Sequence, residues 1–130
     1  MLHEEITGAI IGAGMTVLGA LKPGLDEKLY ENAMVIELKR MGRRTDQQHE
    51  FPVRYRGELI GRLIPDLIID DAVIVDAKVV KQFNDDHIAQ MLGYLAITDL
   101  EVGLLLNFKY AQLKWKRIIR SSQPMSDNAV

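Results

Sequence analysis

The sequence predicts an α/β fold in which helices flank a mixed β-sheet. The chain has 130 residues, enough for one hydrophobic core but not for two. Its residues are 48% hydrophobic and 26% charged, which is typical of soluble globular proteins and unlike disordered chains, collagens or coiled coils. The spacing of the apolar residues is helical twice, strand-like three times, helical again and then strand-like twice. That order predicts one layered α/β domain.

The first helix is expected over about residues 3–20 and ends at Lys22-Pro23-Gly24. The uncharged stretch Ile6–Leu21 is shorter than the roughly 20 residues that a membrane span requires. His3-Glu4-Glu5 stands where a secretory signal would carry positive charge. We therefore expect an internal helix of a cytoplasmic protein without membrane contact. Its glycines would let a neighbouring element pack closely, and they are Gly8, Gly12, Gly14 and Gly19.

The second helix is expected over about residues 26–41, with acidic residues at its positive end and Gly42 as a left-handed cap. Alternation in residues 50–55 predicts a strand, and Arg56-Gly57-Glu58 marks a turn. Two β-rich runs, one helix and two strands follow, and they are expected at residues 59–69, 72–79, 85–98, 102–108 and 113–120.

Charge and cysteine content exclude several classes of protein. The chain has 16 lysines and arginines against 18 aspartates and glutamates, so bulk positive charge does not hold it on nucleic acid. The absence of cysteine excludes a disulfide framework, a thiolate zinc site and a cysteine nucleophile. No helix-turn-helix, zinc-finger or RNA-recognition signature is present. We expect residues 1–120 to form one domain and residues 121–130 a flexible tail.

The most informative stretches are Pro65-Asp66 and Asp76-Ala77-Lys78. A turn at Asp70-Asp71 would fold the two β-rich runs into an antiparallel hairpin. A two-residue loop places Asp66 opposite Val75, and a three-residue loop places it opposite Asp76. In either register the two carboxylates lie about 4.5–8 Å apart. Asp76 and Lys78 are two apart on one strand and so point to the same face.

Two adjacent carboxylates repel one another unless something neutralises them. Mg²⁺ does so with one or two carboxylates and several waters, and it leaves space for phosphate oxygens. Lys78 could orient an attacking water or offset charge on a phosphate. A solvated salt bridge between Asp76 and Lys78 is the alternative. Against it, Val73-Ile74-Val75 indicates an interior strand, where an unpartnered charge is costly.

Two of the predicted helices carry polar residues that suit a site. Glu27 falls in the first turn of its helix, three residues before Tyr30, where helix-dipole complementarity and core packing are the simpler interpretation. His87, Gln90 and Tyr94 share one helix face at i, i+3 and i+7. That face indicates either a polar site or a wet helix surface.

These motifs together resemble the GxxExxY family, a group within the PD-(D/E)XK nuclease superfamily. The resemblance covers about residues 5–120. The matching stretches are Gly24–Tyr30 for the naming heptad, Pro65-Asp66 with Asp76-Ala77-Lys78 for the superfamily signature, Gln90–Tyr94 for a Q-x-x-x-Y element, and Gly103–Phe108 with Arg117–Arg120 for the family's usual ending.

The resemblance implies a restriction-endonuclease-like core in the order ααβββαββ, and hydrolysis of nucleic-acid phosphodiesters with Mg²⁺ or Mn²⁺, DNA being favoured over RNA. Lys78 would act on the water or the phosphate, and Glu27 would reach the metal through water. The implied metal ligands are Asp66, Asp76 and the Ala77 carbonyl, and the implied catalytic or lining residues are Lys78, Glu27, Gln90 and Tyr94.

Three positions depart from the family's pattern. Asp76 replaces the usual glutamate, Leu18 replaces a histidine, and Ile64 replaces an arginine. A shorter acid at position 76 still suits a metal ligand. The catalytic rate and the substrate contacts are the properties that these changes would affect.

Basic residues are candidates for phosphate contacts, although lysines on an edge strand also discourage aggregation. The candidates on the last strand are Lys114, Lys116, Arg117 and Arg120, and Arg54 and Arg56 lie near the central hairpin. Two other functions stay open. One is a catalytically inactive nuclease-fold module that binds within a repair or defence assembly, and the other is a small-molecule phosphatase with a closed pocket. A homodimer or a larger assembly is compatible with each.

Overall fold

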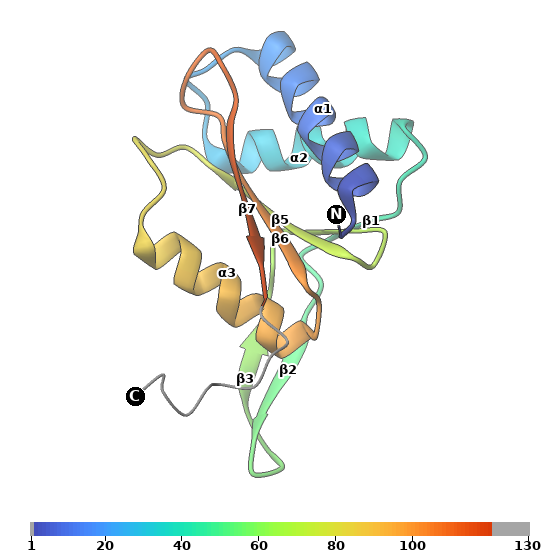
Figure 1. The fold of residues 1–130 in the computed structure, drawn as a ribbon, viewed down its shortest axis with the longest axis vertical. Helices are drawn as coiled ribbons and strands as arrows, with labels where there is room; N and C mark the ends of the chain where they lie inside the picture. The colour runs from blue at the N-terminus through green and yellow to red at the C-terminus, as the bar shows by residue number, and fades with distance from the viewer. Residues whose placement is uncertain (1, 121–130) are drawn as a thin grey trace.

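The computed structural model describes residues 2–120. The helices are α1 (Glu4–Leu21), α2 (Glu27–Arg40) and α3 (Asp85–Thr98). The strands are β1 (Thr45–Gln47), β2 (Phe51–Tyr55), β3 (Glu58–Leu63), β4 (Leu67–Ile69), β5 (Val73–Lys78), β6 (Val102–Asn107) and β7 (Lys114–Ile119). Five strands form one sheet in the order β1-β4-β5-β6-β7, and β2 and β3 form a separate hairpin (Figure 1). The tail expected at residues 121–130 lies outside the described residues.

The five-stranded sheet is mixed, as the sequence predicts. Strands β5 and β6 are parallel, and every other neighbouring pair in this sheet is antiparallel. A parallel pair needs a crossover, and α3 provides it. The chain therefore leaves the carboxyl end of β5 at Lys78, next to the predicted site, and returns along α3.

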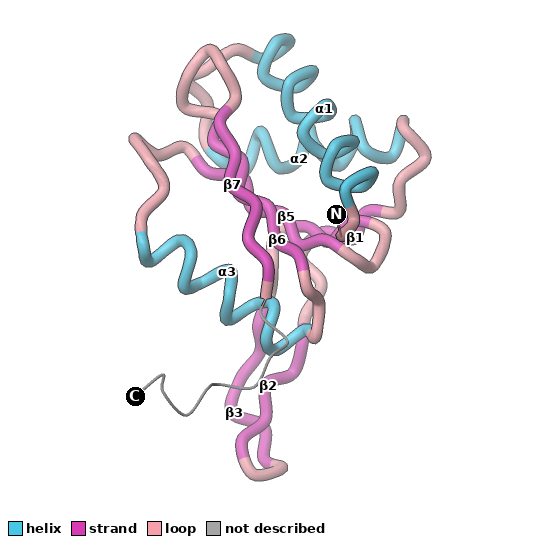
Figure 2. Tube along the Cα trace, viewed as in Figure 1, coloured by secondary structure: helices cyan, strands magenta, loops and turns pink. Residues whose placement is uncertain are grey.

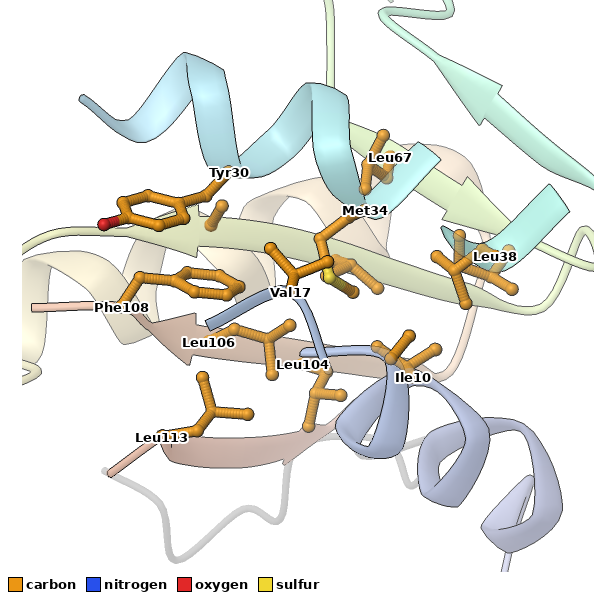
Figure 3. Close-up of a cluster of buried hydrophobic side chains, with 14 of the residues drawn as sticks. Ile10, Val17, Tyr30, Met34, Leu38, Leu67, Leu104, Leu106, Phe108 and Leu113 are labelled. Carbon is orange, nitrogen blue, oxygen red and sulfur yellow. The ribbon is translucent and has the colours of Figure 1, made fainter. Parts of the chain in front are cut away.

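Helices α1 and α2 cover one face of the sheet, and α3 covers the other (Figure 2). Tyr30 of α2 is buried against this sheet, where its ring stacks on Phe108 with centroids 4.7 Å apart (Figure 3). The Tyr30 hydroxyl donates to the Lys22 carbonyl at 2.6 Å. Core packing of Tyr30, the simpler interpretation of that residue, is confirmed.

Helix α1 is long and apolar enough to cross a membrane by length and composition alone, which is weak evidence for a span. In the structure it lies on the sheet and contributes Ile10 and Val17 to the core, as the sequence predicts. Of its glycines, Gly14 has close neighbours: a Cβ there would lie 2.9 Å from Leu113 Cδ2. The expectation of close packing is wrong for the other three, which have nothing within 4 Å, namely Gly8, Gly12 and Gly19.

Two expectations about strands are wrong. The run at residues 59–69 is not one strand: it is divided into β3 and β4, which belong to different sheets. Strand β1 was not expected, because Thr45-Asp46-Gln47 is polar throughout and shows no alternation. It forms by pairing with β4, with Thr45 opposite Ile69. Both differences arise from tertiary pairing, which a local sequence pattern does not encode.

Candidate metal centre

The β4–β5 hairpin brings Asp66 and Asp76 together. Leu67 pairs with Val75, so the next residue pair in this register is Asp66 and Asp76. This is the register of a three-residue loop, one of the two that the sequence left open. Directly opposite residues on one face have Cβ atoms about 4.5–5.5 Å apart. The two carboxylates are therefore close neighbours.

The turn that sets this register is anchored to the end of α2. Asp70 and Asp71 both have positive φ angles, 53° and 55°. The Asp70 carboxylate accepts hydrogen bonds from the Arg43 guanidinium and from the Arg44 backbone N–H, each at 2.9 Å. Arg43 also pairs with Glu5 of α1 at 2.9 Å. These bonds hold the turn that joins β4 to β5, and the pairing of these two strands places Asp66 opposite Asp76.

Asp76 is buried with an unsatisfied oxygen. It is 2% exposed, and its Oδ1 has no hydrogen-bond partner among the described residues. Burial raises the pKa of Asp76, while Lys78 and the backbone N–H of Asp66 act in the opposite direction. A buried carboxylate oxygen without a partner is unfavourable unless a cation compensates it.

Asp66 is the more perturbed neighbour of this pair. Burial, followed by the negative charges of Asp76 and Glu31, raises its pKa to about 7. Lys78 and Lys28 partly offset this rise. Metal ligands must be deprotonated, so a divalent cation bound here would displace the proton of Asp66 and favour the carboxylate.

Lys78 lies on the same face of β5 as Asp76. The side chains of β5 alternate, so that Val75 and Ala77 pack under α1 and α2 while Ile74 packs under α3. Asp76 and Lys78 therefore face α3. Charged residues on one face of this interior strand are compatible with the apolar run because the other face remains entirely apolar.

Helix α3 supplies the polar residues expected next to Lys78. The Lys78 Nζ donates to Gln90 Oε1 at 3.5 Å, a long hydrogen bond. Burial, and then the charges of Asp76 and Asp66, raise the pKa of Tyr94, so its ring lies near the carboxylates. His87 instead caps the helix: its Nδ1 accepts from the Asn84 N–H at 3.1 Å. The structure therefore places Gln90 and Tyr94 close to Lys78 and the carboxylates, whereas His87 caps the helix.

Glu27 and Ala77 occupy positions that suit their expected roles. Glu27 Oε2 accepts from the Val79 N–H at 2.9 Å, one residue after Lys78. Its negative charge contributes to the raised pKa of Asp76. The ladder between β4 and β5 ends at Val75, so only β6 pairs with Ala77 among the described strands. The Ala77 side chain lies in the core, and its backbone lies beside Asp76.

The sequence interpretation missed Glu31, which is buried 4 residues after Glu27 on the same helix face. Its Oε2 accepts from Gln47, Lys28 and Gln48, at 2.7, 2.9 and 3.0 Å. The Gln48 backbone N–H also donates to the Asp66 carbonyl at 3.0 Å. Glu31 is thus connected to the backbone of Asp66 through one residue. The i, i+4 spacing of the two glutamates was the available signal.

The basic residues of β7 do not form one surface. Lys114 pairs with Asn107, which pairs with Lys78, so Lys114 lies two strands from the site on the same face. Lys116 shares that face. Arg117 points to the opposite face, where its guanidinium donates to the Leu2 carbonyl. Arg120 pairs with Asp99 at 2.8 Å. Of these four residues, Lys114 and Lys116 lie on the face of the sheet that carries Asp76 and Lys78.

The residues present fit a small divalent cation. Among residues 2–120, no group of three or more acidic or histidine side chains is arranged to hold a metal ion. Mg²⁺ needs fewer, because it binds through one or two carboxylates and keeps several waters. The unsatisfied Asp76 oxygen next to Asp66 meets that requirement. Two pockets lie elsewhere: one of about 260 Å³ is lined by residues 112–115, and one of about 310 Å³ lies between α1 and residues 111–113.

Comparisons with solved structures identify similar folds. The crystal structure of SSO0001 superposes with a TM-score of 0.57 at 15% identity, covering 98% of this chain. This chain spans 62% of that protein's length. An alkaline exonuclease from Laribacter hongkongensis, LHK-Exo, aligns at 13% identity with a TM-score of 0.49, covering 91% of this chain and 82% of the exonuclease. Its complex with dAMP gives the same TM-score and identity, covering 91% of this chain and 83% of the exonuclease.

No curated protein sequence matches this chain. The family model of the PD-(D/E)XK nuclease superfamily, in contrast, matches residues 4–118. That range contains both carboxylates, Lys78 and the whole five-stranded sheet except Ile119, the last residue of β7. The α/β fold class expected from the sequence, a nuclease-like mixed sheet flanked by helices, is confirmed. The chain belongs to the PD-(D/E)XK nuclease superfamily.

Proposed function

We propose that the protein is a metal-dependent nuclease that hydrolyses phosphodiester bonds, with DNA as the favoured substrate. The observation that supports this most is the adjacent Asp66–Asp76 pair, in which one oxygen of the buried Asp76 has no partner among the described residues and lies beside Lys78. Mg²⁺ or Mn²⁺ would be held by these carboxylates and the Ala77 carbonyl. The superfamily generally uses divalent metal ions.

Lys78, Gln90 and Tyr94 would have separate roles around the scissile phosphate. A bound divalent cation would polarise the phosphate and lower the pKa of a bound water. The Lys78 ammonium would orient the attacking water or offset charge that develops on the phosphate. Gln90 restrains the Lys78 Nζ through its 3.5 Å contact. Tyr94 would line the same opening.

Glu27 would hold the backbone next to Lys78 in place. Its bond to the Val79 N–H fixes the chain just after Lys78, and its remaining oxygen could reach the cation through water. We also propose membership in the GxxExxY family. The heptad Gly24–Tyr30 supports this, since Gly24 has a φ of 117° that favours glycine, Glu27 contacts the site and Tyr30 fills the core.

The test is cleavage of linear, nicked and single-stranded DNA with Mn²⁺ or Mg²⁺, beside a reaction in EDTA. The Lys78→Ala and Asp76→Asn variants should each lose activity by about 10²-fold or more, as expected for loss of a group that stabilises the transition state. Lys39→Ala, an exposed change at the end of α2, is the matched control and should retain wild-type activity. Equal activity of Lys78→Ala and the wild type would contradict the proposal.

Two other outcomes would replace the proposal with another function. Metal binding in a calorimeter without cleavage of any nucleic acid would identify an inactive module with a nuclease fold. Turnover of a generic phosphomonoester without DNA cleavage would identify a phosphatase. Neither carboxylate lines the pockets of about 260 and 310 Å³ next to Gln112 and Leu113.

A further inference from the structure

The β2–β3 hairpin projects from the body of the molecule (Figure 1). Its strands pair only with each other, and its base is held by Phe51, which packs against the core under α3. Its outer part is exposed: Tyr55 is 62% exposed, and Ile60 is 66% exposed. Large apolar side chains on a projecting ribbon are unfavourable in water unless a partner covers them.

Arginine and aliphatic side chains share one face of this hairpin. Pro52 pairs with Arg62, and Arg54 pairs with Leu59, while the register shifts by one residue between Val53 and Arg54. Alternation along the strands then places Arg62, Arg54 and Leu59 on the same face. The shift leaves Ile60 unpaired beside them. Arg62 also pairs with Glu50 at 3.7 Å, so Arg54 is the arginine of this face that forms no ion pair among the described residues.

A third cation occupies the tip at a position that disfavours it. Arg56 and Gly57 form the turn with φ angles of 49° and 80°. Two-residue turns with positive φ at both positions favour Asn-Gly or Asp-Gly. Here the first turn position is occupied by Arg56. Its guanidinium lies 5.6 Å from the Tyr55 ring centroid, and its Nε donates to the Tyr55 hydroxyl at 3.2 Å. The tip therefore carries a positive charge at some conformational cost.

We infer that this hairpin is an arm that docks in the major groove of duplex DNA, an inference that rests on the proposed nuclease function. A two-stranded ribbon fits the major groove of B-form DNA, whereas the major groove of A-form RNA is too narrow. The arginines complement the phosphates on the groove walls. Leu59 and Ile60 can contact thymine methyl groups on its floor.

The arm is connected directly to the candidate metal centre. Strand β3 ends at Leu63, and Asp66 follows it along the chain. A strand of five or six residues extends about 17–20 Å. At about 3.4 Å per base pair, the tip reaches roughly five base pairs from the scissile phosphate. The arm thereby adds duplex contacts away from the site of hydrolysis.

The experiment measures binding of a fluorescein-labelled 24-base-pair DNA duplex by anisotropy, at several salt concentrations in Mg²⁺. All proteins carry Lys78→Ala, so that the duplex stays intact. The arm variant combines Arg54→Gln with Arg56→Asn, since asparagine accepts the positive φ of the tip. Lys39→Gln with Arg40→Gln removes the same charge from the end of α2 and is the matched control.

The arm variant should bind the DNA duplex about tenfold more weakly at 100 mM salt. The slope of log Kd against log salt should fall by about 1.8, the value for two lost phosphate contacts. The control should match the parent. Ile60→Ser should weaken binding several-fold with the slope unchanged. Binding of a 24-base-pair RNA duplex should be equal for the parent and the arm variant.

Failure of the arm and failure of the nuclease function give different results. If the arm variants have the Kd and slope of the parent, the DNA-binding role of the hairpin is wrong, even if the wild type cleaves DNA. DNA binding that depends on the arm, in a protein that cleaves no nucleic acid with Mn²⁺, would overturn the nuclease function alone. Sedimentation that shows a dimer abolished by Ile60→Ser, with unchanged DNA binding, would make the hairpin a self-association surface and overturn the arm.

Discussion

The two faces of strand β5 differ in what they bury. One face places Val73, Val75 and Ala77 in the core beneath α1 and α2. The other begins with Ile74 under α3 and continues with Asp76 and Lys78. Burying a whole aliphatic side chain contributes about 1.5–3 kcal/mol, whereas a buried carboxylate without a partner is costly. The apolar face stabilises the fold, and this stability offsets the unfavourable burial of the charged groups on the other face.

The contrast is tested most strongly by a change on the apolar face of the sheet, where Leu104 of β6 pairs with Val75 of β5. Leu104→Ala removes a fully buried side chain beneath α1 and α2. It should lower the free energy of unfolding by about 2–5 kcal/mol, since such changes leave a cavity. Urea titration measures this loss. Cleavage activity per folded molecule, assayed well below the midpoint, should remain that of the wild type. A large loss of activity in the folded variant would mean that the faces are not independent.

A change at Glu31 tests how the charged face is held in place. Glu31→Gln removes the negative charge and one of the two acceptor oxygens that hold Lys28, Gln47 and Gln48, and the last of these bonds to the Asp66 carbonyl. Because such supporting contacts position ligands, Mn²⁺ affinity should fall about 10–100-fold. Isothermal calorimetry measures it. Glu37→Gln, on the same helix, is the control, and equal affinities for the two variants would contradict the role of Glu31.

The smallest expected effect concerns the proton on Asp66. The carboxyl has a pKa of about 7 in the fold, against an ordinary value of 3.8 for aspartate. Between these values the folded protein holds a proton that the unfolded chain has released, so the free energy of unfolding falls as pH rises from about 4 to 7. Asp66→Asn removes this titration. Without metal, it should raise stability at pH 8 by about 1 kcal/mol, a figure reduced for the partial exposure of the carboxyl.

Calorimetric scans in EDTA at pH 5 and pH 8 check this expectation. The Tm of the Asn variant minus that of the wild type should grow with pH and reach about 3 °C at pH 8. Mg²⁺ should then raise the Tm of the wild type more than that of the variant. A Tm difference that shrinks as pH rises would show that Asp66 is ionised in the metal-free fold.

Most elements of the fold could be predicted because their signals are local. The helix over Glu27–Arg40 begins with acidic residues and is followed by Gly42 with a φ of 79°. The buried strand Val102–Asn107 has a continuous apolar run. The division of residues 59–69 was not predictable, since both halves are β-rich. What separates them is the choice of partner strand, which depends on the rest of the chain.

The site was predictable only in part for the same reason. Asp66, Asp76 and Lys78 are related by hairpin spacing, which the sequence displays. Glu31 acts through Gln47 and Gln48, and these residues belong to β1 and the turn after it, a strand that forms only by pairing with β4. From the sequence alone, the partners of Glu31 therefore cannot be identified.

The division between β3 and β4 has a further consequence. Asp66 stands at the corner where one polypeptide passes from the hairpin into the five-stranded sheet, and its register is set by the Asp70 turn on the far side. Pairs of residues added or removed at the hairpin tip would therefore leave the carboxylate in place. The length of the hairpin and the geometry of the carboxylates can therefore change independently of each other.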